Sequence, residues 1–136
     1  MVPPSRLPKL LRWVAGPCVA VVLVAASAAC SGGEESSGPP VTGAAAEGQQ
    51  LFRTNGCAAC HSVDGSDGVG PTLQGLLGSQ VELQGGGTVT ADEAYLRESI
   101  VNPSAKKVAG YSAAMPAREL SPSEVDALVA YISALR

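Results

Sequence analysis

The chain is poor in several residue types on which whole classes of function depend. It has one histidine, His61, and aromatic residues make up only 4% of its 136 residues. There is therefore no second histidine for an acid/base pair. Positive charge is also scarce, with 9 Lys and Arg against 12 Asp and Glu and no basic stripe, which argues against nucleic acid as a partner.

The first thirty residues have the pattern of an export signal. Three basic residues lie within the first 12, an apolar run covers 14–29, and small residues lead to Cys30. The apolar run is short for a spanning helix, so residues 1–30 are predicted to be a signal peptide. A retained membrane anchor is the alternative.

The end of this segment resembles a bacterial lipoprotein signal, in which the cysteine becomes lipidated. Ala28-Ala29-Cys30 is followed by Ser31-Gly32-Gly33, although Ser27 stands where that family usually has a branched aliphatic residue. Cleavage after Ala28 is the other possibility. Lipidation of Cys30 is favoured, because a free exposed thiol would be an odd remainder in an oxidising compartment. The expected location is the periplasm or the outer face of the cytoplasmic membrane, held there by the lipid.

Residues 31–45 are predicted to be a flexible linker. They are mostly Gly, Ser, Pro, Ala and Glu, which cannot bury enough apolar surface to fold. Such a linker spans roughly 20 Å. The folded domain is then expected at 46–136. Without the signal the chain keeps six basic and 12 acidic residues, so its net charge is near −6.

The sequence Cys57-Ala58-Ala59-Cys60-His61 has the spacing of a haem c attachment site. Two thiols three positions apart can add to the two vinyl groups of one haem, and His61 can supply the proximal nitrogen. A thioredoxin-type redox pair would need a βαβ context, which is absent. A zinc site would need two more ligands, and only Cys18 and Cys30 remain, both in the export segment. One covalent haem c is the prediction.

The sequence predicts one helix before this motif and further helices after it. A first helix is predicted over 47–55, ended by Asn55-Gly56. A second helix opens on the capping box Thr90-Ala91-Asp92-Glu93, with Thr90 as N-cap, and stops at Asn102-Pro103. The folded domain is expected to have a small core, because it contains few aromatic residues. A porphyrin would add apolar bulk to that core.

The clearest amphipathic pattern lies at the end of the chain. Ser121-Pro122-Ser123-Glu124 is a second capping box, with proline at the first helical position. The apolar residues after it recur at helical spacing: Val125, Leu128, Val129, Ile132 and Leu135. Glycine-rich residues 62–78 predict a loop around a flat ligand. Residues 81–83 and 88–89, on either side of three glycines, predict a small hairpin.

Met115 is the candidate for the second iron ligand. It lies in Gly110-Tyr111-Ser112-Ala113-Ala114-Met115-Pro116 and is the only methionine besides the initiator. Iron held between His and Met is typical of electron-carrying cytochromes, and the thioether raises the potential. Alternatively, Met115 fills a core gap, and the sixth position is then empty, water-filled or taken by Lys106 or Lys107.

Together these motifs resemble a class I, single-haem bacterial cytochrome c, most closely the cytochrome c domain fused to subunit II of caa-type oxidases. The matching pieces run over the folded part: Gly48, Phe52, CAACH at 57–61, Gly70-Pro71, 90–103, 110–116 and 120–135. The resemblance implies an all-α fold of about three to five helices around one haem. It also implies that the first and last helices cross where Gly48, Phe52 and Tyr131 meet, and that the Pro71 carbonyl accepts a hydrogen bond from His61.

The function implied by this resemblance is electron transfer, with redox proteins as partners: a terminal oxidase or a quinol-oxidising complex. The chain has no copper-site ligands of an oxidase subunit II, so it is not expected to be that subunit. A small peroxidase would need an open iron, and a gas sensor would need Met115 to dissociate readily; neither enzyme activity nor a small-molecule substrate is expected. Lys106, Lys107 and Arg118 flank Met115 and are candidates for contact with an acidic partner, or are simply solvated.

Overall fold

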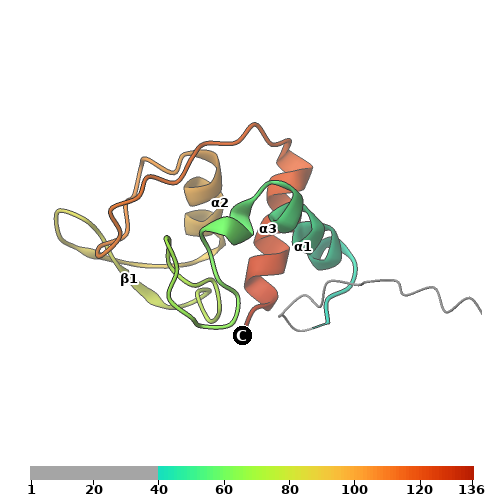
Figure 1. The fold of residues 1–136 in the computed structure, drawn as a ribbon, viewed down its shortest axis with the longest axis horizontal. Helices are drawn as coiled ribbons and strands as arrows, with labels where there is room; N and C mark the ends of the chain where they lie inside the picture. Colours follow the sequence, from blue (N-terminus) through green and yellow to red (C-terminus); the bar gives the residue numbers. More distant parts are fainter. Residues whose placement is uncertain (1–39) are drawn as a thin grey trace, which may run out of the picture. The chain divides into compact units, whose positions relative to one another are not determined.

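A computed structural model describes residues 40–136, so the predicted signal peptide and Cys30 lie outside the described residues. The described part contains three α-helices and one short 3-10 turn: α1 (Ala44–Thr54), η1 (Cys57–Ala59), α2 (Glu93–Val101) and α3 (Pro122–Ala134) (Figure 1). Its one sheet pairs β1 (Gln80–Glu82) with β2 (Thr88–Thr90). None of the helices in this part is long and apolar enough to span a membrane.

Helix α3 forms as predicted and supplies much of the core. The Ser121 hydroxyl accepts a hydrogen bond from the Glu124 amide, and the Glu124 carboxylate accepts one from the Ser121 amide. Pro122 lies in the first turn of the helix. This reciprocal capping satisfies donors that a helix otherwise leaves open. The apolar residues predicted for this helix are buried: Val125, Leu128, Val129, Ile132 and Leu135.

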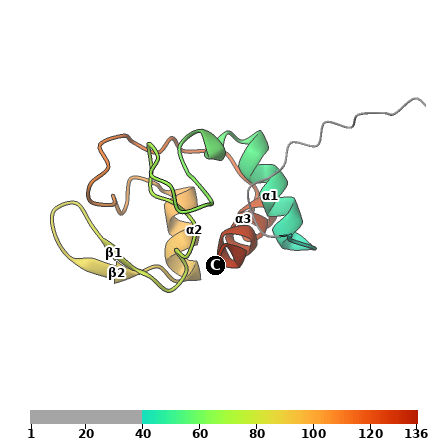
Figure 2. The same cartoon turned by 60° about the horizontal axis from the view of Figure 1, so that its bottom comes forward.

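Helices α1 and α3 cross at a glycine. A Cβ placed on Gly48 would lie 1.9 Å from the Ala127 carbonyl oxygen and 2.8 Å from the Tyr131 Cβ, so only a residue without a side chain fits there. One turn later, the Phe52 and Tyr131 rings pack with centroids 5.6 Å apart. Figures 1 and 2 show the two helices lying across each other. The crossing implied by the sequence resemblance is confirmed.

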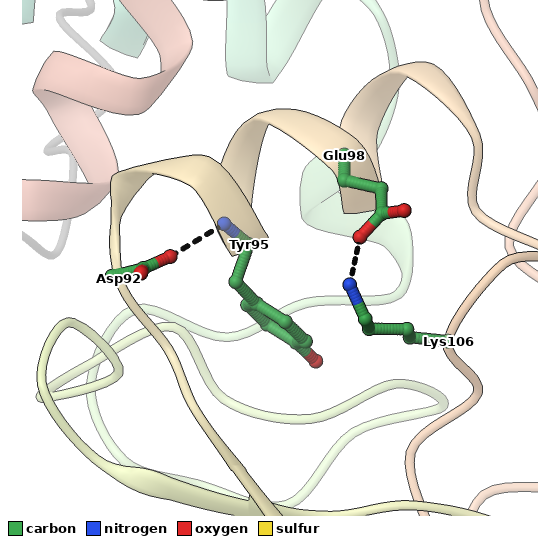
Figure 3. A network of polar contacts seen from close by, with 4 residues as sticks. All are labelled: Asp92, Tyr95, Glu98 and Lys106. Atoms are coloured by element: carbon green, nitrogen blue, oxygen red, sulfur yellow. Dashed lines mark hydrogen bonds and ion pairs between the residues drawn. The ribbon is translucent and has the colours of Figure 1, made fainter.

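Two element boundaries differ from the predictions. Helix α1 starts at Ala44, so the last two residues assigned to the linker are helical. Thr90 is not the N-cap of α2, because it ends strand β2, paired with Gln80. The helix therefore begins after Asp92, whose carboxylate accepts from the Tyr95 amide at 2.7 Å (Figure 3).

The predicted hairpin is present, with strands shifted by one residue. Val81 faces Val89 in its register, and Gly85, Gly86 and Gly87 form the tip, each with a φ between +87° and +95°. Residues without a Cβ adopt that backbone at little cost. The segment between α2 and α3 runs back along this hairpin before it reaches α3 (Figures 1 and 2), and Leu83 bridges to Val108 there.

Candidate haem-binding site

The CAACH motif forms a tight turn directly after α1. Gly56 has φ +74°, and η1 follows, with the His61 amide donating to the Cys57 carbonyl at 3.0 Å. Cys57 and Cys60 are half-buried free thiols. The turn therefore places both thiols and the imidazole within five consecutive residues.

The glycine–proline pair of the next loop holds His61 in place. Its Nδ1 lies 2.8 Å from the Pro71 carbonyl oxygen, which can only accept, so Nδ1 carries the proton. The tautomer leaves the Nε2 lone pair free, and no described residue forms a hydrogen bond to it. Gly70 packs on the ring itself: a Cβ there would be 2.7 Å from His61 Cε1. An imidazole fixed in this way suits a metal ligand.

The predicted loop at 62–78 folds back onto the motif. The Gly70 amide donates to the Cys60 carbonyl and the Leu73 amide to the Ser62 carbonyl, each at 2.9 Å. Val69 is 56% exposed at its edge. Large exposed apolar side chains are what a flat hydrophobic group would cover.

Met115 lies on the segment between α2 and α3 and is 37% exposed. Its thioether forms no hydrogen bond with the described residues, so the lone pairs on sulfur remain available. The same segment returns to the attachment turn three residues later: a Cβ on Gly56 would lie 3.9 Å from Arg118 Nη2. The structure thus brings the loop that carries Met115 back to the cysteine motif.

Burial has the largest effect on the pKa of the Cys57 thiol, followed by the charge of Arg118. Burial raises this pKa, and the positive charge of Arg118 lowers it by a smaller amount, so the net pKa is above the ordinary value. Arg118 is the cation that the fold places beside the attachment turn.

The three cations near Met115 do not behave alike. Lys106 forms an ion pair with Glu98 of α2 (Figure 3), which offsets its charge. Lys107 and Arg118 are exposed and form no ion pair within residues 40–136. Of the three candidates for contact with an acidic partner, Lys107 and Arg118 are thus the two without an ion pair among these residues.

Other contacts bear on the alternatives. No group of three or more His, Cys, Asp or Glu in residues 40–136 could hold a metal ion, which gives the zinc alternative no support there. Sequence reasoning missed Gln84, whose side chain bonds to the carbonyls of Val108 and Tyr111. No local pattern signals this contact, since its partners are 24 and 27 residues away.

Comparisons with known proteins agree with this architecture. The sequence profile of the Cytochrome c family matches residues 45–136. Cytochrome c2 iso-1 of Magnetospirillum molischianum is 32% identical over 92 residues, covering 60% of this chain and 92% of that protein. Cytochrome c2 of Rhodoplanes tepidamans is 31% identical over 99 residues, covering 60% and 93%.

A solved structure shows the same fold. Cytochrome cH from Methylobacterium extorquens is 31% identical, with a TM-score of 0.50, and the match covers 67% of this chain and 98% of that one. The predicted small cytochrome c fold is confirmed. The chain therefore belongs to the cytochrome c family, carries one covalently attached haem c and functions in electron transfer.

Proposed function

We propose that the chain is an exported, lipid-anchored cytochrome that carries single electrons between respiratory-chain partners, towards a terminal oxidase. Cys57 and Cys60 attach the haem, and His61 and Met115 are the two axial ligands. The observation that carries this proposal is the hydrogen bond from His61 Nδ1 to the Pro71 carbonyl, which leaves Nε2 free for iron.

Each of these residues would have a different role in binding the haem. When bound, the haem supplies a one-electron redox centre. Pro71 holds the His61 ring in one orientation and makes it a stronger donor. Gly70 leaves room for that ring. Met115 would offer its thioether to the haem iron, and a thioether ligand would raise the reduction potential.

Replacing Met115 with Ala tests the ligand assignment. The wild-type ferric protein should show a weak absorption band at about 695 nm, as expected for Met ligation. Met115→Ala should lose that band and lower the potential, keep its haem, and bind carbon monoxide when ferrous. Lys106→Gln and Lys107→Gln serve as controls and should keep the band. An unchanged spectrum and potential in Met115→Ala would assign the ligand elsewhere.

Covalent attachment has its own test. Acid–acetone extraction should leave haem on the exported protein, and mass spectrometry should find it on the peptide that contains Cys57 and Cys60. Haem that extracts completely and leaves two free thiols would contradict attachment at these residues.

The anchor and the location rest on Cys30, which lies outside the described residues. Cys30→Ser should release a soluble, haem-loaded protein, whereas the wild type should fractionate with the membrane and face the periplasm. A soluble wild type would mean that the signal is cleaved without lipidation. A mutant that stays in the membrane would mean that the segment is retained.

For the partner we favour a terminal oxidase over a quinol-oxidising complex, because the sequence motifs resemble those of a cytochrome c domain fused to an oxidase subunit. Lys107 and Arg118 are the exposed cations that could steer an acidic docking surface. Replacing both with Gln should lower the second-order rate with purified oxidase at low salt and flatten its salt dependence. Lys106→Gln should have a smaller effect, because Glu98 already offsets its charge. A double variant as fast as wild type at every salt concentration would exclude these residues from docking.

A further inference from the structure

The loop that carries Met115 has little internal support. Within the described residues, no backbone-to-backbone hydrogen bond involves residues 110–120. Residues 112–119 are all exposed. A loop with few hydrogen bonds and little burial opens at low free-energy cost. Met115 is therefore held in place mainly by whatever fixes the two ends of this loop.

The C-terminal end of the loop is fixed by the start of α3. The Ser121 amide donates to the Glu124 carboxylate at 2.7 Å, which ties the last loop residues to the capping box. The hydrogen bond at this end of the loop is local, because both of its partners lie at the start of α3.

The N-terminal end is fixed by the hairpin. The Gln84 amide donates to the Lys107 carbonyl and the Ala109 amide to the Glu82 carbonyl, both at 2.8 Å. These two bonds flank the isolated bridge between Leu83 and Val108 and hold residues 107–109 against the hairpin. The backbone contacts end there, six residues before Met115.

The Gln84 side chain adds contacts beyond this bridge. Its Nε2 donates to the Tyr111 carbonyl at 2.6 Å and to the Val108 carbonyl at 3.3 Å. The two carbonyls lie on either side of Gly110, which has φ +85°. One amide group thereby fixes the turn from which the loop departs, four residues before Met115.

We propose that Gln84 is a positioning residue for Met115: it restricts the loop so that the thioether stays close to its bound position. This inference rests on the proposed ligation by Met115. Without the Gln84 amide the loop samples more conformations, and the bond from Met115 to iron opens more often. Gln84 is exposed, so water competes for these hydrogen bonds and the effect is modest.

Binding of imidazole to the ferric protein measures this opening, because an external ligand can occupy the position only when Met115 has left it. Gln84→Ala should bind imidazole about threefold to tenfold more tightly than wild type, the range for losing one or two exposed hydrogen bonds. Gln84→Glu keeps the shape of the side chain but replaces the donor, and should behave like the Ala variant. Gln80→Ala is the matched control. Gln80 lies on the same hairpin, and within residues 40–136 its side chain donates to the Thr90 hydroxyl rather than to the Met115 loop, so the imidazole affinity of this variant should equal that of wild type.

Amide hydrogen exchange over residues 108–115 provides a second readout that does not depend on the ligand, and it should accelerate in Gln84→Ala. Faster exchange with unchanged imidazole affinity would overturn the proposal, because Gln84 would then support the loop without positioning Met115. A wild type that binds imidazole as tightly as Met115→Ala would overturn the proposed ligation and this inference with it. An equal increase in imidazole affinity in Gln84→Ala and Gln80→Ala would also overturn it. Loss of any side-chain hydrogen bond of the hairpin would then be enough to loosen Met115.

Discussion

Replacing Gly48 with Ala should destabilise the domain strongly. The new methyl carbon would meet the Ala127 carbonyl oxygen at 1.9 Å and the Tyr131 Cβ at 2.8 Å. A carbon–oxygen contact normally needs about 3.3 Å, so the two helices would have to separate by more than about 1 Å. Overpacking of this kind costs about 1–3 kcal/mol and occasionally more, and removing a glycine from a helix returns about 1 kcal/mol. Because the obstacle is backbone, the cost should lie at the upper end of that range, and we expect a net loss of about 2 kcal/mol.

Denaturant titration of the haem-loaded protein, followed by far-ultraviolet circular dichroism, measures this loss. Gln50→Ala, at an exposed position of the same helix, is the control and should change stability by less than about 0.5 kcal/mol. Adding Ala127→Gly to Gly48→Ala should not rescue it, because the clashing oxygen belongs to the main chain. A Gly48→Ala protein that unfolds at the same or a higher denaturant concentration would refute the close crossing of α1 and α3.

Two further substitutions test the site and the cap of α3. Gly70→Ala places a methyl group 2.7 Å from His61 Cε1, so it should shift the haem spectrum and lower the unfolding free energy by about 1–3 kcal/mol; a wild-type spectrum and denaturation midpoint would contradict the contact. The hydrogen bonds from Ser121 lower the pKa of Glu124 below its ordinary 4.5, so their contribution is fully present above pH 4.5 and declines as pH falls through the lowered value. The stability advantage of wild type over Glu124→Gln should follow that course, and an advantage that is independent of pH would show that the carboxylate charge plays no part.

The parts of the fold that could be predicted from sequence depend on local chemistry. The CAACH turn and the start of α3 each lie within five consecutive residues, so their spacing carries the information. The start of α2 could not be read in this way. Both Thr90 and Asp92 are good N-cap residues, and the pairing of Thr90 with Gln80, a contact across ten residues, decides between them.

The same distinction between local and distant contacts applies to the residues of the site. The sequence pattern indicated His61 and Met115 as candidate ligands, and the resemblance supplied Pro71 as the hydrogen-bond partner of His61. Gln84 lies in a glycine-rich hairpin whose pattern says nothing about the distant carbonyls it contacts. The ion pair of Lys106 could not be predicted from the sequence either, because its partner Glu98 lies on another element.

The crossing of the first and last helices sets an order of events during synthesis. Among the described elements, α1 packs chiefly on α3, so it lacks that surface until α3 has been made. The end of α3 at Ala134 follows Thr54, the end of α1, by 80 positions, and at roughly 5–20 residues per second that is a delay of about 4–16 s. For that interval the core cannot close, because the surface that covers α1 is not yet available. A truncation that removes α3 should therefore leave the domain without a stable core.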